Sequence, residues 1–148
     1  MILTDKQRNA VIHEAITWIG TPWHHMARVK VAGVDCGMFL LEVYERAGII
    51  GHVEPPPYPA DWSMHRSDEK YLAFVEKFCV RVDAPLPADL VTFRLGRCVS
   101  HAAIVINWPL IIHSCVGQGV IMDDGIANVW FAERVEGFYR YTGECDGR

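Results

Sequence analysis

The sequence predicts a single domain of the α+β class, with helices in its first part and an antiparallel sheet in its second. Apolar residues recur at three- and four-residue spacings in the first half, which is typical of amphipathic helices. After Pro85 and Pro87 the pattern changes to short β-type runs separated by turn residues. Because 148 residues suit one domain better than two, we expect residues 1–148 to form one unit.

Composition narrows the classes of function. The chain is 51% hydrophobic and 22% charged, as in globular proteins. A net charge of −4 without a run of Lys or Arg argues against nucleic-acid binding. The N-terminus turns polar at Thr4 and no apolar run approaches a membrane span, so we expect no signal peptide, no membrane span and synthesis in the cytoplasm.

The cysteines favour a reducing environment. They number five, are widely scattered and form no C-x-x-C pair: Cys36, Cys79, Cys98, Cys115 and Cys145. An odd, scattered set of cysteines argues against a disulfide framework and against a zinc ribbon, and it fits synthesis in the cytoplasm.

The first predicted helix follows Thr4, which suits an N-cap. Its apolar stripe consists of Val11, Ile12, Ala15, Ile16 and Ile19, and it ends at Gly20. Residues 21–25 must be non-helical, because the residue before Pro22 is pushed toward extended conformations.

A cysteine stands at the start of the second predicted helix. Gly33 and Asp35 suit a chain reversal and an N-cap, so Cys36 is expected to be the first or second helical residue. The apolar face comprises Phe39, Leu40, Val43, Tyr44 and Ala47, and the helix stops near Gly48. Unpaired N–H groups and the helix dipole there favour a thiolate. The alternative is a small buried core cysteine.

A proline-rich stretch separates this helix from a third one. Residues 51–66 contain four prolines with Tyr58 and Trp62 as aromatic anchors, which predicts an ordered surface loop. Ser67, Asp68 and Glu69 begin the third helix, whose apolar face is Tyr71, Leu72, Val75 and Phe78. Residues 90–93, 102–107, 110–115, 120–122 and 138–141 are the predicted strands of an antiparallel meander.

Two histidines lie within predicted strands. His101 and His113 are twelve residues apart, and a tight turn at Trp108-Pro109 would pair their strands and bring both imidazoles to one end of the sheet. One ring could then orient the other through a hydrogen bond. The alternative for either residue alone is a structural, hydrogen-bonded histidine.

A metal site is a weaker interpretation of the same residues. Cys36, His101 and His113 are legitimate zinc ligands, but H-E-x-x-H is absent and a fourth ligand has no obvious candidate. We therefore expect no metal and no cofactor. The loop pair His24-His25 is more in keeping with a solvent-facing or substrate-contacting position than with a metal pair.

Several motifs together resemble the NlpC/P60 cysteine peptidases. The first are Gly20-Thr21-Pro22-Trp23-His24-His25-Met26-Ala27 and Val34-Asp35-Cys36-Gly37-Met38-Phe39. The others are Pro59-Ala60-Asp61-Trp62 with His65, Ala88-Asp89-Leu90-Val91, Ser100-His101-Ala102-Ala103-Ile104-Val105, Ile112-His113 and Gly137-Phe138-Tyr139-Arg140. They cover nearly the whole chain in the family's order, and they are most similar to the phage-type branch found with tail-tip genes of phages and gene-transfer particles.

The resemblance implies a papain-like domain in which a nucleophile helix packs on a five- or six-stranded antiparallel sheet. It also implies cleavage of peptide bonds in the peptidoglycan stem, typically between D-γ-glutamyl and a diamino acid. By motif, Cys36 matches the nucleophile, His101 the general base and His113 the third residue, which orients the base. The residues expected to contact the substrate are Trp23, His24, Asp35 and Ser100.

Three positions depart from the family pattern. Trp23 stands where the family has a tyrosine near the oxyanion, and an indole donates only an N–H, from a different place. Gly37 replaces the usual Ser or Leu after the cysteine, and Ala88 replaces a glycine. We expect these changes to affect oxyanion geometry and substrate preference more than the triad.

The resemblance further implies peptidoglycan peptides as substrate and phage tail-tip or hub proteins as partners. A cell-wall enzyme without a secretion signal needs delivery, and a phage or phage-like tail would supply it. Two alternatives differ in class. One is a structural tail-assembly protein that keeps the fold and docks through residues 51–66. The other is a thiol amidase or acyltransferase, although the Cys-before-His order argues against the circularly permuted acyltransferases.

Overall fold

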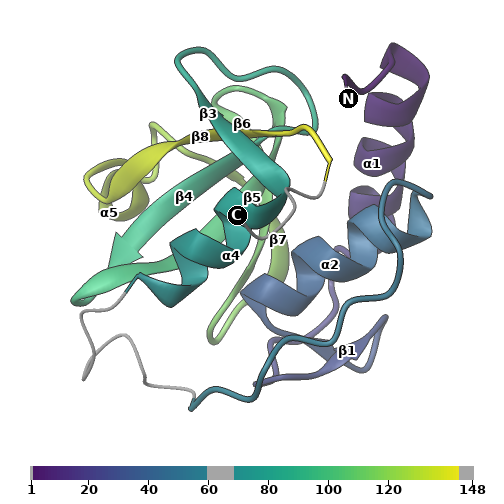
Figure 1. Cartoon of the computed structure of the whole chain (residues 1–148). Coiled ribbons are helices and arrows are strands. Elements are labelled where there is room, and N and C mark those ends of the chain that lie inside the picture. The colour runs from purple at the N-terminus through teal and green to yellow at the C-terminus, as the bar shows by residue number, and fades with distance from the viewer. Residues whose placement is uncertain (1, 60–68, 144–148) are drawn as a thin grey trace.

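A computed structural model describes residues 2–59 and 69–143 and confirms the α+β fold. Its helices are α1 (Asp5–Thr17), α2 (Cys36–Arg46), α4 (Lys70–Phe78) and the short α5 (Val129–Ala132). The main strands are β3 (Cys79–Val82), β4 (Leu90–Leu95), β5 (Cys98–Asn107), β6 (Leu110–Cys115), β7 (Gly119–Asp124) and β8 (Val135–Tyr141). Helices α1, α2 and α4 pack beside this sheet (Figure 1).

The six strands are antiparallel and lie in the order β3-β8-β4-β5-β6-β7. Strands β4 to β7 form the predicted meander. The prediction is wrong at one end of the sheet, where β8 returns to pair with β4 and β3 adds an outer strand. The sequence analysis missed β3, because its four residues directly follow α4 without a turn signal. A separate small hairpin joins β1 (Arg28–Val29) to β2 (Gly33–Val34).

Helix α1 begins as predicted, and its C-terminal part differs. The side chain of Thr4 accepts a hydrogen bond from the Gln7 N–H, and the Gln7 side chain accepts one from the Thr4 N–H, completing a capping box. Ile16 and Ile19, which the sequence analysis placed on the apolar stripe, are instead exposed. Trp18, just beyond the helix, is fully buried in their place.

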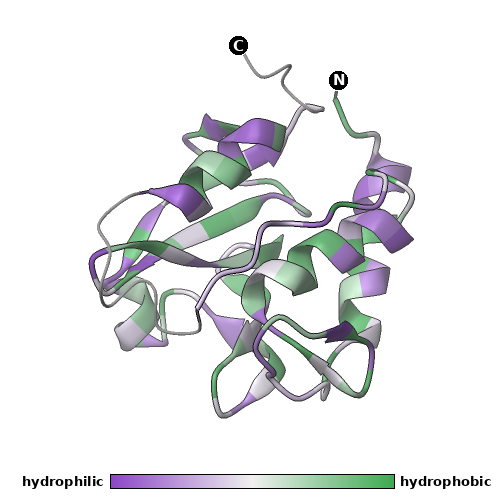
Figure 2. Cartoon of the chain, turned by 60° about the horizontal axis from the view of Figure 1, so that its bottom comes forward, coloured by the Kyte–Doolittle hydropathy of each residue, from purple (hydrophilic) through white to green (hydrophobic). Residues whose placement is uncertain are grey.

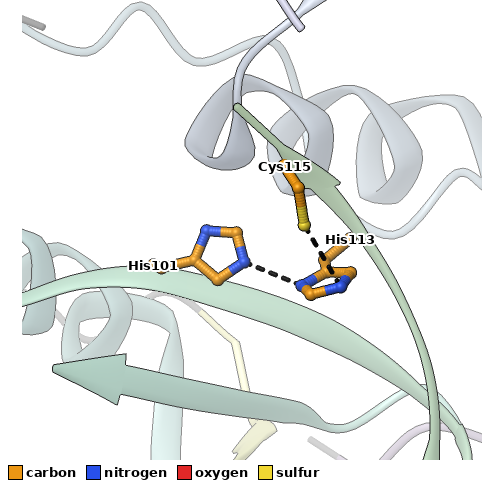
Figure 3. Close-up of side chains that lie close together, drawn as sticks. All are labelled: His101, His113 and Cys115. Carbon is orange, nitrogen blue, oxygen red and sulfur yellow. Dashed lines mark hydrogen bonds between the residues drawn. The ribbon is translucent and has the colours of Figure 1, made fainter. Parts of the chain in front are cut away.

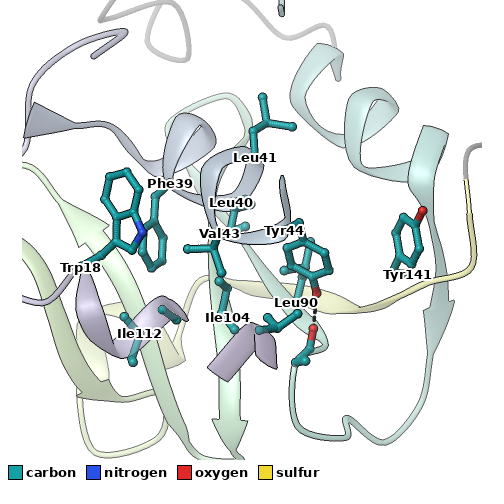
Figure 4. Packing of buried hydrophobic residues seen from close by; sticks show 14 of the residues in the cluster. Trp18, Phe39, Leu40, Leu41, Val43, Tyr44, Leu90, Ile104, Ile112 and Tyr141 are labelled. Atoms are coloured by element: carbon teal, nitrogen blue, oxygen red, sulfur yellow. Dashed lines mark hydrogen bonds between the residues drawn. The ribbon is translucent and has the colours of Figure 1, made fainter. Parts of the chain in front are cut away.

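Helix α2 starts at Cys36, as predicted. Asp35 is its N-cap, and the Asp35 side chain accepts a hydrogen bond from the Met38 N–H at 2.9 Å. Phe39, Leu40, Val43 and Tyr44 form its buried face. Figure 4 shows these side chains packed beside Ile104 of β5 and Ile112 of β6. The cysteine therefore stands at the end of a helix that the core holds firmly against the sheet.

The proline-rich segment and then α4 follow α2 along the chain. Residues 51–59 have no regular secondary structure, in agreement with the predicted loop, whereas Trp62, His65, Ser67 and Asp68 lie outside the described residues. The predicted apolar face of α4 packs on the core, with Val75 buried and Tyr71, Leu72 and Phe78 half-buried. Glu69 stands at the N-cap position of α4, but its side chain makes no capping hydrogen bond. Its carboxylate instead accepts hydrogen bonds from the Val99 N–H and from the Arg94 side chain.

Two apolar clusters cover the sheet. The larger lies between the sheet and the helices, and the smaller includes Val91, Phe93 and Ile111 with Phe131 of α5. The longer helices carry both hydrophobic and hydrophilic residues along their length (Figure 2). Among the described residues no helix is long and apolar enough to span a membrane.

A buried carboxylate ties α1 to the sheet. Asp89 is 1% exposed and forms ion pairs with Arg8 of α1 at 3.2 Å and with Arg140 of β8 at 2.8 Å. Its other hydrogen bond comes from the Leu86 N–H at 2.7 Å. The preceding residue, Ala88, has φ 74°, a conformation that glycine adopts more easily and that accounts for the glycine of the family motif.

Candidate active site

The start of α2 is fixed by the carboxylate of Asp35, which is 3% exposed. One oxygen caps the helix at Met38, and the other accepts hydrogen bonds from the Met26 N–H at 2.8 Å and from the Tyr58 hydroxyl. We expected Asp35 to contact substrate. It borders the site cavity, but the fold itself uses both of its oxygens.

The surroundings of Cys36 disfavour ionisation of its thiol. Burial raises its pKa to about 12, and the neighbouring carboxylate of Asp35 adds to this effect. Hydrogen bonding by the Tyr71 hydroxyl and the Gly37 N–H acts in the opposite direction and only partly offsets it. Burial therefore outweighs the helix-terminal N–H groups and dipole, which by themselves favour a thiolate at a helix start.

Three side chains form a hydrogen-bonded relay that ends near this cysteine. His101 Nε2 lies 2.8 Å from His113 Nδ1 (Figure 3). His113 Nε2 lies 2.9 Å from an oxygen of Asp123. The prediction that the two histidines meet is thus confirmed. Since Asp123 accepts, His113 Nε2 carries a proton and its Nδ1 accepts from His101 Nε2–H. This leaves His101 Nδ1 unprotonated, which is the state that a general base requires.

The surroundings keep both rings neutral. His101 is 4% exposed and His113 is fully buried, between the rings of Phe93 and Phe131. Burial lowers the pKa of His101 well below its usual value, and the neighbouring His113 adds to this effect. Burial likewise lowers the pKa of His113, against an opposing effect of Asp123.

Asp123 completes the relay, and the sequence analysis missed it. Partial burial raises its pKa, but hydrogen bonds from Asn128, the Asp124 N–H and His113 outweigh burial, so its pKa is lowered. His113 pairs with Ile121 across β6 and β7, which places Asp123 two residues further on the same face. An acidic pair directly after the apolar run of β7 was the signal that could have revealed it.

Cys36 and His101 line one cavity of about 620 Å³. Within the described residues they share no hydrogen bond; the thiol donates instead to the carbonyl of Ser100, at 3.5 Å. His113 lies behind His101 and does not line the cavity. Hydrogen bonds between a catalytic thiol and its base often tighten only when substrate binds, so their absence here is compatible with a catalytic pair.

The remaining predicted residues divide into two groups. Trp23 and Ser100 line the cavity. His24 is exposed and does not line it, whereas the next residue, His25, does, with its ring stacked on Trp23 at 6.5 Å between centroids. A second thiol, Cys115, also lines the cavity, and its sulfur lies 3.2 Å from His113 Nε2.

The relay also brings together atoms that bind metals. Ligand atoms of His101, His113 and Cys115 lie within 4.8 Å of one another. A Zn²⁺ ion would have to displace hydrogen bonds there, since Asp123 and His101 already engage the two ring nitrogens of His113. These contacts are better suited to proton transfer than to coordination.

The buried histidines predict a loss of stability in acid. Their pKa values are lower in the folded than in the unfolded chain, so unfolding takes up protons and stability falls as pH drops below the unfolded value near 6.5. We expect the free energy of unfolding to fall by up to about 1.4 kcal/mol per histidine for each pH unit below that value. Urea titrations at pH 7.5 and 5.5 measure this, and a His113→Gln variant should show a smaller difference.

Solved structures share this architecture. A lipoprotein-like NLP/P60 family protein from Staphylococcus aureus superposes with a TM-score of 0.67 at 17% identity, over 97% of this chain and 44% of its own. The NlpC/p60 domain of the peptidoglycan hydrolase SagA gives a TM-score of 0.60 at 20% identity, over 91% of this chain and 98% of that domain. The peptidoglycan hydrolase RipB from Mycobacterium tuberculosis gives 0.56 at 14% identity, over 95% of this chain and 66% of its own.

Sequence comparison adds nothing to these similarities: no protein-family model and no curated protein matches the chain. The chain spans less than half of the S. aureus protein but nearly all of the SagA domain. At these identities the comparisons show that the chain has the fold of NlpC/P60 domains.

Proposed function

We propose that the chain is an NlpC/P60-type cysteine peptidase that cleaves peptide bonds in the stem of peptidoglycan. The observation that carries this proposal is the His101–His113–Asp123 relay, which reaches the same cavity as a thiol at a helix start. Nucleophile, base and orienting groups in this order are the components of thiol acyl transfer. Two structural neighbours, SagA and RipB, are peptidoglycan hydrolases by name, which supports the choice of substrate.

The geometry supports a mechanism that begins from a neutral pair. As the sulfur attacks the substrate carbonyl carbon, the thiol proton passes to His101 Nδ1, and His113 with Asp123 stabilises the imidazolium. The Cys36 N–H, unused within the helix at its first position, donates to the oxyanion. His101 then returns the proton to the leaving amine, and water, deprotonated by the same base, hydrolyses the thioester.

The finer assignment rests on the sequence resemblance. We propose a D-γ-glutamyl–diamino acid bond as the scissile bond, and delivery by a phage or phage-like tail whose tip or hub proteins are the partners. The motifs around Trp23 and Cys36 and the Ser100-His101 segment support this.

Digestion of purified peptidoglycan followed by mass spectrometry of the soluble products tests the proposal. Cleavage should release fragments whose masses correspond to stems cut between the second and third residues, with one water added for each bond broken. Protein alkylated beforehand with iodoacetamide is the control. Intact stems after prolonged digestion with unmodified protein would contradict the proposal.

The relay predicts that the charge of Asp123 affects catalysis although Asp123 does not line the cavity. Asp123→Asn keeps an acceptor oxygen but removes the charge that, through His113, stabilises protonated His101, so we expect kcat to fall about 10- to 100-fold. Asp124→Asn is the matched control, since among the described residues its carboxylate accepts hydrogen bonds from the N–H groups of Ile126 and Ala127 and from no histidine. Equal kcat values for the two variants would show that Asp123 does not contribute to catalysis through the relay.

The lining of the cavity favours a second candidate, transfer or hydrolysis of an acyl group on the same thiol. Away from Cys36 the cavity is bordered by apolar side chains, among them Leu40, Leu41, Ile50, Phe74 and Phe78. Lys70 is the one Lys or Arg among its described lining residues, although stem peptides carry several carboxylates. A series of p-nitrophenyl esters with acyl chains of two to twelve carbons tests this: kcat/KM rising with chain length, with no release of muropeptides, would favour acyl transfer.

A further inference from the structure

A buried phenol lies directly beside the candidate nucleophile. Tyr71, in the first turn of α4, lines the cavity, and its ring edge (Cε2) lies 3.6 Å from where a side chain at Gly37 would begin. The ring therefore lies over the first turn of α2, next to Cys36. Its hydroxyl oxygen is buried and, within the described part of the chain, forms no hydrogen bond of standard geometry.

A buried polar group without a hydrogen-bond partner lowers the stability of a folded protein and is rare, so the position of this hydroxyl calls for an explanation. The Tyr71 hydroxyl lies close enough to the Cys36 thiol to lower the pKa of that thiol, although the two groups form no hydrogen bond of standard geometry. Burial and the proximity of Cys36 raise the pKa of Tyr71 well above its usual value. The phenol therefore keeps its proton and remains a donor throughout the working range of pH.

The other donors near the thiol are already occupied or differently placed. The hydroxyl of Tyr58 donates to the carboxylate of Asp35. Trp23 carries an indole N–H where the resembling family has a phenol. The N–H groups of Cys36 and Gly37 lie in the first turn of α2 and therefore have no carbonyl partner within the helix. A desolvated negative charge is, however, better stabilised by several donors than by one.

We propose that Tyr71 is a catalytic residue that donates its O–H hydrogen bond to the negative charge that forms at the reaction centre, first on the Cys36 sulfur and then on the substrate oxyanion. The proton stays on the phenol throughout, so the balance of the acyl-transfer steps is unchanged. The proposal rests on the proposed thiol chemistry and adds a donor from α4, an element separate from the helix of the nucleophile.

Tyr71→Phe tests this, because it removes the hydroxyl and keeps the ring. We expect kcat on muropeptides to fall about 100-fold, as for the loss of one oxyanion donor, with KM changed less than about twofold. Alkylation of Cys36 by iodoacetamide, followed by mass spectrometry between pH 7 and 10, should slow at every pH, because its thiolate loses a donor. The melting temperature should not fall, since the hydroxyl makes no standard hydrogen bond.

Tyr139→Phe is the matched control, because Tyr139 of β8 does not line the cavity and its hydroxyl donates to the carboxylate of Glu136. It should leave kcat and the rate of Cys36 alkylation at their wild-type values. Unchanged kcat and unchanged alkylation in Tyr71→Phe would overturn the proposal and leave the peptidase assignment intact. If even the unmodified protein cleaves no peptidoglycan, the peptidase assignment fails separately, and the alkylation profile still decides whether Tyr71 acts on the thiol.

Discussion

Replacing Cys36 with alanine is expected to lower kcat/KM on muropeptides by at least about 10⁴-fold, to the limit of detection. In the proposed mechanism Cys36 forms the thioester, and the loss of one triad member ordinarily removes most of the catalysis that the triad provides. The fold should persist, because within the described residues the Cys36 thiol makes one hydrogen bond of standard geometry, a long one to the Ser100 carbonyl at 3.5 Å.

The informative comparison for this variant is Cys115→Ala. Both thiols line the cavity and burial raises the pKa of each to about 12, but Cys115 contacts His113 and stands at the end of a strand, away from a helix start. Full activity in Cys36→Ala together with loss of activity in Cys115→Ala would show that Cys115, and not Cys36, is the nucleophile. A wild-type protein that is itself inactive, with Cys36 inert to alkylation at pH 9, would favour the structural tail-assembly role.

Replacing His101 with alanine is expected to lower kcat about 10³- to 10⁴-fold, because His101 is the only imidazole of the relay that lines the cavity. Steady-state kinetics on a purified muropeptide measure this. The same variant should lose part of the acid sensitivity of folding, since one of the two histidines with lowered pKa is gone.

The control for His101 is His13→Ala, an exposed histidine on α1. It should retain wild-type kcat and wild-type stability between pH 7.5 and 5.5. If His101→Ala also kept wild-type kcat, the relay would be a structural hydrogen-bond network, the alternative that applies to any buried strand histidine. Recovery of activity in His101→Ala by added imidazole would instead support the role of general base.

Local signals in the sequence were sufficient for most of the elements and for part of the site. Thr4 with Gln7, and Asp35 before an apolar stripe, define helix starts because capping depends on residues three apart in the chain. The Asp35 cap also predicted the position of Cys36 at the helix start. The contact between His101 and His113 was predictable because the turn of a hairpin fixes which residues of its two strands lie near each other.

The sequence by itself thus determined the fold class, the helix that begins at Cys36 and the histidine pair. The tertiary structure alone decided where β8 returns in the sheet, which carboxylate completes the relay, and that Tyr71 of α4 lies over the first turn of α2. It also decided the protonation of the thiol. Helix position favours a thiolate locally, but the desolvation that opposes it comes from segments distant in sequence, whose packing no local pattern encodes.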